Sequence, residues 1–153
     1  MFYVCKNAIA MIRIGIIGDD RNIVNHINII KSIPEFEYKG FYYPNGANAN
    51  INLRARKLNR FLSYKEFLDS VDAIDIASTK STLYDTVISA LKKSKHIYIS
   101  PLLLKSYEQA LKIIKLANEA NITLMVQKAA KYNAALNSVI ERLSDTRLIE
   151  IQH

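Results

Sequence analysis

The feature that most constrains the fold is an apolar strand that runs into a glycine turn and then into an amphipathic helix. Residues 12–17 read IRIGII, Gly18 and two aspartates follow, and residues 21–32 carry apolar side chains at helical spacing. Pro34 then ends the helix, because proline cannot continue it. A strand, a tight turn and a helix in this order form the opening unit of an α/β domain.

Strands and helices alternate along the rest of the chain. The sequence predicts further strands at residues 37–43, 73–77, 97–99, 123–126 and 148–151. It predicts further helices at residues 53–58, 65–70, 82–93 and 134–143, and from Ser106 to near Asn121. This alternation predicts a doubly wound, mainly parallel sheet with helices on both faces.

Capping residues and apolar stripes locate the predicted helices more closely. Ser63 with Glu66, and Ser106 with Gln109, have the spacing of a reciprocal N-terminal cap. The helix after residue 82 has a predicted core face of Leu83, Val87, Ala90 and Leu91. The helix after Ser106 has a predicted apolar stripe of Ala110, Leu111, Ile114 and Ala117.

The composition argues against several classes of protein. Half of the 153 residues are hydrophobic, which excludes wholesale disorder, and no apolar run is long enough to cross a bilayer. The net charge of +7 comes from lysines and arginines spread along the chain, which disfavours nucleic-acid binding. A single cysteine, Cys5, forms no internal disulfide, so the expected location is cytoplasmic. Cys5 and three scattered histidines provide no metal site.

Several segments, in the right order, give the chain its resemblance to a known family. They are IGIIG at 14–18, GFYYPN at 40–45, SYKEFLDSVDAIDIAS at 63–78, ALKKSKHIYI at 90–99 and KYNAAL at 131–136. From Met11 onward the chain resembles the N-terminal domain of the Gfo/Idh/MocA oxidoreductases, the glucose-fructose oxidoreductase and inositol dehydrogenase family. The resemblance implies a Rossmann-type domain that binds NAD or NADP, with the substrate held by a second, mostly β-sheet domain.

At the cofactor turn, the chain keeps one of the three glycines of the G-x-G-x-x-G spacing. The three positions are occupied by Gly18, Asp20 and Ile23. Asp20 fills the space through which the backbone approaches a pyrophosphate, and its charge opposes the ligand. Cofactor binding is therefore predicted to be weakened or lost. Asp19 and Asp20 have a second interpretation, which we favour over a rearranged cofactor site: they cap the N-terminus of the helix.

Three further positions implied by the resemblance lie at strand ends. Tyr43 stands where the family often places an acidic residue near the ribose, and a tyrosine cannot accept two hydrogen bonds from a diol as a carboxylate can. Ser78 and Thr79 follow the central strand and are candidates for cofactor contact. Leu83 occupies the position of a family histidine and is interpreted as a core residue.

The lysine through which the family binds substrate and transfers protons is missing. Without a gap, the Glu-Lys-Pro motif becomes Ser100, Pro101 and Leu102, and a shift by one residue puts Ser100 at the lysine. Proline has no proton to exchange, and Lys105 lies too far along the chain to be a strong substitute. No catalytic residue is predicted. His96, which precedes the strand, is expected to make a local hydrogen bond.

The expected domain boundaries follow from the family resemblance. Residues 1–10 are predicted to be a peripheral extension, residues 11–147 the Rossmann-type domain, and residues 148–153 the remnant of the first strand of an absent second domain. The apolar strand at residues 148–151 lacks its expected neighbours, and an unpaired strand favours edge pairing. A homodimer or a partner chain at this strand is therefore predicted.

Three functions are compatible with the sequence. The first is a family-type NAD(P)-binding domain that is inactive by itself, has weakened or lost cofactor binding, and acts as a binding or assembly module. The second is the NAD(P)-binding part of an oxidoreductase that another chain or a missing C-terminal domain completes. The third and least favoured is a basic nucleic-acid-binding protein.

Overall fold

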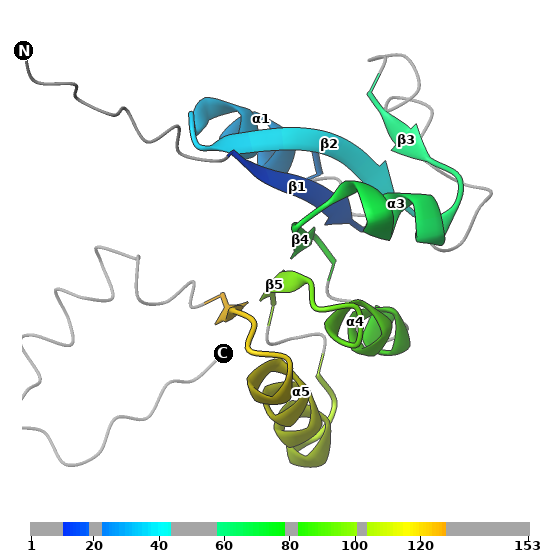
Figure 1. The fold of residues 1–153 in the computed structure, drawn as a ribbon, viewed down its shortest axis with the longest axis vertical. Coiled ribbons are helices and arrows are strands. Elements are labelled where there is room, and N and C mark those ends of the chain that lie inside the picture. The colour runs from blue at the N-terminus through cyan, green and yellow to red at the C-terminus, as the bar shows by residue number, and fades with distance from the viewer. Residues whose placement is uncertain (1–10, 19–22, 44–57, 79–82, 101–103, 128–153) are drawn as a thin grey trace, which may run out of the picture.

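The computed structural model describes residues 11–18, 23–43, 58–78, 83–100 and 104–127 of the chain. Six strands form one sheet: β1 Ile12–Ile17, β2 Phe36–Tyr42, β3 Arg60–Phe61, β4 Ala73–Ile76, β5 His96–Ile99 and β6 Leu124–Val126. The helices are α1 Ile23–Ser32, α3 Tyr64–Ser70, α4 Tyr84–Leu91 and α5 Tyr107–Glu119 (Figure 1).

All five strand pairings are parallel, and the strand order is β3-β2-β1-β4-β5-β6. This is the strand order of the doubly wound, dinucleotide-binding α/β fold. The predicted parallel α/β sheet is therefore confirmed.

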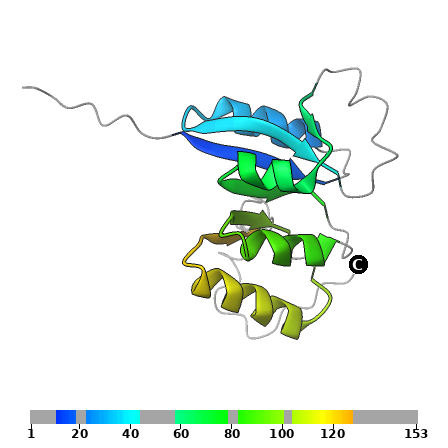
Figure 2. The same ribbon diagram turned by 45° about the vertical axis from the view of Figure 1, so that its right-hand side comes forward.

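Helices cover both faces of the sheet, but they do so unequally. α3, α4 and α5 lie on one face, which we call the three-helix face, and α1 lies on the opposite face, the α1 face (Figure 2). Side chains along β1 alternate between the two faces of the sheet. Ile14 and Ile16 face α1, whereas Ile17 belongs to the core of the three-helix face. Gly15 lies under α3, where a Cβ would meet the ring of Phe67.

The predicted caps are formed. The Ser63 side chain accepts a hydrogen bond from the Glu66 N–H at 3.4 Å, and Ser106 accepts one from Gln109 at 3.3 Å. Gln109 Oε1 reaches back to the N–H of Lys105 at 2.9 Å. α5 ends before Asn121, whose φ of 50° lies in the left-handed region that stops helices.

Several predicted boundaries and faces need correction. The helix predicted at 82–93 spans Tyr84–Leu91, and the chain turns at Ser94, which has a φ of 54°. Leu111 and Ile114 are each 47% exposed, while Ile113 takes the buried place on α5. Ile12 is 41% exposed because it begins β1 at the rim of the sheet.

Other predictions agree with the structure or lie outside the described residues. Leu83, Val87, Ala90 and Leu91 are all buried as predicted. The sequence analysis missed the two-residue strand β3. Outside the described residues lie segment 1–10, most of the predicted helix 53–58, the predicted helix 134–143 and the predicted strand 148–151.

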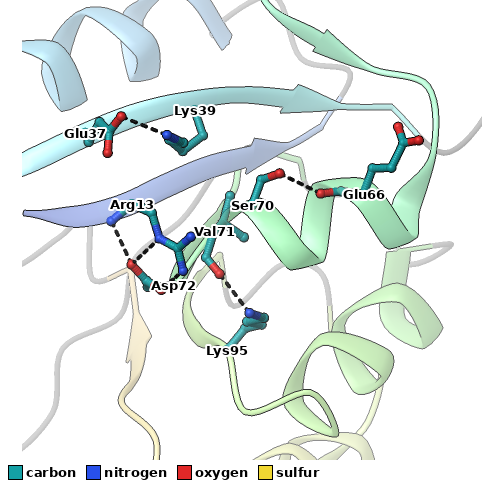
Figure 3. Close-up of polar contacts among 8 residues, drawn as sticks. All are labelled: Arg13, Glu37, Lys39, Glu66, Ser70, Val71, Asp72 and Lys95. Carbon is teal, nitrogen blue, oxygen red and sulfur yellow. Dashed lines mark hydrogen bonds and ion pairs between the residues drawn. The ribbon is translucent and has the colours of Figure 1, made fainter.

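Charged contacts join the amino ends of β1 and β4. The Arg13 side chain donates to Asp72 through Nη2 at 2.5 Å and Nε at 2.9 Å, and its backbone N–H adds a bond of 3.1 Å (Figure 3). Lys95 donates to the Val71 carbonyl at 2.8 Å. The hydrogen bonds from the Arg13 side chain are the main reason that the pKa of Asp72 falls to about 2.

Candidate functional site

The candidate site lies where the carboxyl ends of the parallel strands meet. Gly18 follows β1, Tyr43 follows β2, Ser78 lies just beyond β4, and Ser100 follows β5. The order of strands reverses between β1 and β4, and ligands of open α/β sheets bind in the crevice at this switch point. The structure therefore brings these four sequence-predicted residues to one edge of the sheet.

Gly18 is required by the packing of the strands themselves. Its N–H donates to the Tyr42 carbonyl at 3.4 Å, and beside it the Ala77 N–H donates to the Ile17 carbonyl at 2.9 Å. A Cβ on Gly18 would overlap the carbonyl oxygen of Ala77 and lie 2.7 Å from its carbonyl carbon. The fold alone therefore explains why a glycine stands here, whether or not a pyrophosphate binds.

Ile23, at the third position of the glycine spacing, is a core residue. Its side chain is 1% exposed and belongs to the apolar cluster between α1 and the sheet, together with Ile16, Phe41 and Ala77. A dinucleotide therefore finds only backbone groups at this position. Asp20, with the neighbouring Asp19, lies outside the described residues, and so does Thr79.

The strand-end residues offer few groups to a ligand. Tyr43 is half-buried, and Ser78 is only 4% exposed and takes part in interactions within the protein. The preceding tyrosine, Tyr42, packs against Tyr64 and Phe67, with ring centroids 5.1 Å and 5.9 Å away. The sequence analysis did not identify this aromatic cluster, although the repeated aromatic residues near the ends of the strands were a signal for it.

The lysine position carries no amine in the part of the chain that the structure describes. Ser100 is half-buried directly after β5, and Pro101 lies outside the described residues. Lys105 is exposed in the segment that leads into α5. Of the two residues that could stand at the lysine position, the described one, Ser100, therefore offers a hydroxyl group in place of an amine.

Sequence reasoning missed a hydrogen-bonded histidine–aspartate pair beneath α1. His26 Nδ1 lies 2.6 Å from Asp75 Oδ2, and the two side chains are 28% and 12% exposed. The other oxygen, Asp75 Oδ1, is buried and accepts no hydrogen bond from a described residue. The signal for this pair was an aspartate inside the apolar strand VDAIDIAS.

The local contact expected of His96 can be checked directly. His96 makes the predicted local hydrogen bond, because its Nδ1 accepts from the Thr123 N–H at 2.9 Å. Among the described residues, no three histidine, cysteine, aspartate or glutamate side chains gather as a metal ion would require. Of the helices in the described ranges, none has the length and apolar character needed to cross a bilayer.

A comparison with protein families identifies the fold at this site. The model of the GFO_IDH_MocA family, described as an oxidoreductase family with an NAD-binding Rossmann fold, matches residues 12–128. The chain belongs to the Gfo/Idh/MocA oxidoreductase family. A search of curated protein sequences found no match to the chain.

Solved structures support the family fold. An NAD-binding protein from Listeria innocua is 21% identical, with a TM-score of 0.76 over 89% of this chain and 41% of that one. The WlbA dehydrogenase from Bordetella pertussis, solved with NADH and UDP-GlcNAcA, is 23% identical, with a TM-score of 0.73 over 90% of this chain and 43% of that one. UDP-N-acetylglucosamine 3-dehydrogenase GnnA from Acidithiobacillus ferrooxidans is 21% identical, with a TM-score of 0.71 over 86% of this chain and 43% of that one. The chain thus spans less than half the length of these three proteins.

The backbone of the described residues follows a path that could hold a dinucleotide, but their side chains offer it few contacts. The strand order is that of the dinucleotide-binding fold, and Gly18 lets the backbone pass close to Ala77. Ile23 and Ser78, by contrast, are buried in the protein, and Ser100 brings no charge to the edge of β5. Where NAD or NADP binds, it would supply hydride chemistry, and the backbone at Gly18 and the N-terminus of α1 would hold it.

Proposed function

We propose that this chain is an NAD(P)-binding-type Rossmann domain with weakened cofactor binding, which carries out no oxidoreduction by itself and serves as a binding or assembly module. The observation that carries the proposal is Ser100 at the carboxyl end of β5. Either Ser100 or Pro101 takes the place of the lysine that the family resemblance implies, and neither can protonate or deprotonate a substrate at neutral pH.

The weakened affinity follows from the charge at the second glycine position. Two like charges about 4 Å apart, at an effective dielectric near 20, repel each other by about 4 kcal/mol. Half of that energy, about 2 kcal/mol, lowers an affinity by more than tenfold. Asp20 therefore disfavours both NAD and NADP, and Ile23 gives no compensating contact because its side chain is buried.

Titration with NADH and with NADPH, followed by nicotinamide fluorescence, tests this proposal. We expect millimolar binding or none for the natural sequence, and an affinity at least about tenfold higher for Asp20→Gly. Asp19→Gly is the matched control, because it removes the same charge from the neighbouring position. Micromolar binding by the natural sequence would contradict the proposal, and so would an equal gain in both variants.

The second candidate function is the NAD(P)-binding part of an oxidoreductase that another chain or a further domain completes. It is favoured by the coverage of the solved structures, of which this chain matches 41–46%. Reading the gene beyond His153 tests it. A β-sheet domain in the same frame would favour the second candidate, whereas a stop codon together with millimolar cofactor binding would favour the first.

We also propose that the assembly contact is the apolar segment 148–151, through which two copies or a copy and a partner chain pair edge to edge. The support is the sequence LIEI, which gives three apolar side chains in four residues. Light scattering at high micromolar concentration is expected to give the mass of a dimer, and Ile149→Lys is expected to give a monomer. A monomer for the natural sequence would contradict homodimer formation.

A further inference from the structure

One side of α5 exposes three large apolar side chains. Tyr107 is 72% exposed, and Leu111 and Ile114 are each 47% exposed. Because they stand four and three residues apart, they form one stripe along the helix, which we call the α5 stripe. α5 is the last of the described helices and lies at one end of the described fold (Figure 1, Figure 2). The α5 stripe is therefore placed where another molecule can reach it.

A different side of α5 holds the helix on the sheet. Ile113 and Ala117 belong to the core of the three-helix face, and Leu116 packs against that core. The α5 stripe is not part of this contact, because its side chains remain exposed. Large apolar side chains that gather on an exposed side mark a surface for contact with another molecule, since such a contact removes them from water.

Charged side chains run beside the α5 stripe. Glu108, Lys112, Lys115 and Glu119 are all exposed. With about 3.6 residues per turn, Lys115 and Glu108 lie next to the stripe, whereas Lys112 lies farthest from it round the helix. Lys115 Nζ lies 3.9 Å from Glu119 Oε1, and both side chains are exposed, so this pair is weak and Lys115 can take another partner.

The α5 stripe and its charged border are nearly symmetric about Leu111. Tyr107 stands four residues before Leu111, and Ile114 stands three residues after it. Glu108 stands three residues before it, and Lys115 stands four residues after it. In an antiparallel pair of α5 helices with Leu111 against Leu111, Tyr107 of one copy falls within one residue of Ile114 of the other. Glu108 likewise falls within one residue of Lys115, which carries the opposite charge.

A surface that matches itself in this way is what a twofold contact between identical chains requires. The charges also favour the antiparallel direction. A parallel pair in the same register would set Glu108 beside Glu108 and Lys115 beside Lys115, and like charges across an interface repel each other. An antiparallel pair replaces both repulsions by two attractions.

We propose that the α5 stripe is a self-association surface, on which α5 of a second copy of this chain packs antiparallel. Leu111 lies on the twofold axis. Tyr107 packs against Ile114 of the other copy, and Glu108 pairs with Lys115 of the other copy.

The contact is expected to be weak. A stable interface commonly buries about 800 Å² on each partner, and the three side chains of the α5 stripe supply only a part of such an area. The net charge of +7 on each copy further opposes association. We therefore expect association above the high micromolar range, so the pairing proposed for segment 148–151 is the stronger contact at lower concentrations.

Cysteine cross-linking captures such a weak contact in the full chain. In a Cys5→Ser, Ile149→Lys background, Leu111→Cys places a thiol on the twofold axis, and Lys112→Cys is the matched control at the next residue. Each rate of disulfide-linked dimer formation is divided by the rate at which the same thiol reacts with a small disulfide reagent, which corrects for exposure and thiolate content. We expect the corrected rate for Leu111→Cys to be at least about ten times that for Lys112→Cys. Equal corrected rates would overturn the proposal, and so would a Leu111→Cys thiol that the small reagent cannot reach.

Charge reversal tests the direction and register of the pair. In the Leu111→Cys background, Glu108→Lys sets two positive charges against each other in every antiparallel contact, and Lys115→Glu sets two negative ones. Each variant alone should therefore cross-link several-fold more slowly. An equimolar mixture should recover the rate through mixed dimers, because one variant then supplies both positive charges and the other supplies both negative ones. A size tag on one variant identifies the mixed dimer by non-reducing electrophoresis.

The mixture also removes the effect of each substitution on α5 itself, because the same two chains are compared alone and together. A mixture that cross-links no faster than the single variants would overturn the proposed antiparallel contact.

The result does not depend on the function proposed above. Ile149→Lys removes the edge pairing proposed for segment 148–151, and no dinucleotide is added. A failure of Leu111→Cys to cross-link therefore rejects the α5 contact alone. Titration with NADH and light scattering of the natural sequence test the proposed function separately.

Discussion

The two faces of the sheet differ in how fully they are packed. On the three-helix face, Phe67, Val71, Val87 and Leu91 are completely buried within one apolar cluster. On the α1 face, a smaller apolar cluster lies beside a hydrogen-bonded histidine–aspartate pair and an open groove. Among the described residues, the three-helix face therefore buries more apolar side chains than the α1 face does, and we expect substitutions on it to cost the most stability.

The largest expected effect comes from emptying the three-helix face. Phe67→Ala removes a fully buried ring that packs against Tyr42, Phe61 and Tyr64, and it should lower the free energy of unfolding by about 3–5 kcal/mol. Urea unfolding measures the loss. Leu62→Ala, at a side chain that is 85% exposed, is the control and should stay within about 0.5 kcal/mol. A loss below 1 kcal/mol for Phe67→Ala would contradict the view that the three-helix face is the more tightly packed of the two faces.

An intermediate effect is expected at the junction of β1 and β4. Gly18→Ala forces a Cβ against the backbone of Ala77, and such overpacking costs about 1–3 kcal/mol. Thermal and urea unfolding without any dinucleotide measure it, with Asn28→Ala on the exposed side of α1 as the control. Unchanged stability would mean that Gly18 is kept for a ligand and not for strand packing.

A smaller effect is expected from the histidine–aspartate pair on the α1 face. His26→Ala leaves the buried Asp75 without the partner at Oδ2, which should cost about 1–2 kcal/mol. Replacing both residues by leucine should recover part of this loss, because no buried polar group is then left without its partner. Urea unfolding of His26→Leu, Asp75→Leu and the double variant measures the coupling between the two residues. A double variant that loses as much as the two single variants together would show that the pair does not act as a unit.

Periodicity predicted the strands and most helical faces because the spacing of apolar residues reports which side is buried. It placed part of the face of α5 wrongly. Ala117 is buried as predicted, but apolar residues at 110, 111, 113 and 114 allow more than one stripe, and packing buries Ile113. It could not find β3, because a strand of two residues, Arg60 and Phe61, is too short to show an alternation of apolar and polar side chains. A strand this short is defined by its pairing with β2.

The candidate site was predictable in its position and not in its contacts. Parallel strand ends bring Gly18, Tyr43, Ser78 and Ser100 to one edge, and the sequence order alone implies this. The burial of Ser78 depends on packing between segments distant in sequence. The same holds for the histidine–aspartate pair beneath α1, whose members are 49 residues apart.

The smallest expected effect belongs to the charged contacts at the amino ends of the strands, which touch neither core. Arg13 and Asp72 are 41% and 40% exposed in their side chains, so solvent screens most of their attraction. Asp72→Asn should therefore lower the stability by less than His26→Ala does. Glu37→Gln, in the ion pair with Lys39 on β2, is the matched control and should change the stability even less.

The sign of the pH dependence makes this small effect measurable. Hydrogen bonds from Arg13 lower the pKa of Asp72 from its ordinary value of 3.8 to about 2, so the folded protein binds this proton less readily than the unfolded chain. The stabilisation is fully present above about pH 4 and fades as the pH falls towards 2. The difference in unfolding free energy between the natural sequence and Asp72→Asn should shrink over that window, as urea titrations at pH 5, 4 and 3 can follow. A difference that stays constant would assign the loss to the geometry of the hydrogen bonds, because a bond that depends on the carboxylate charge must weaken when the carboxylate is protonated.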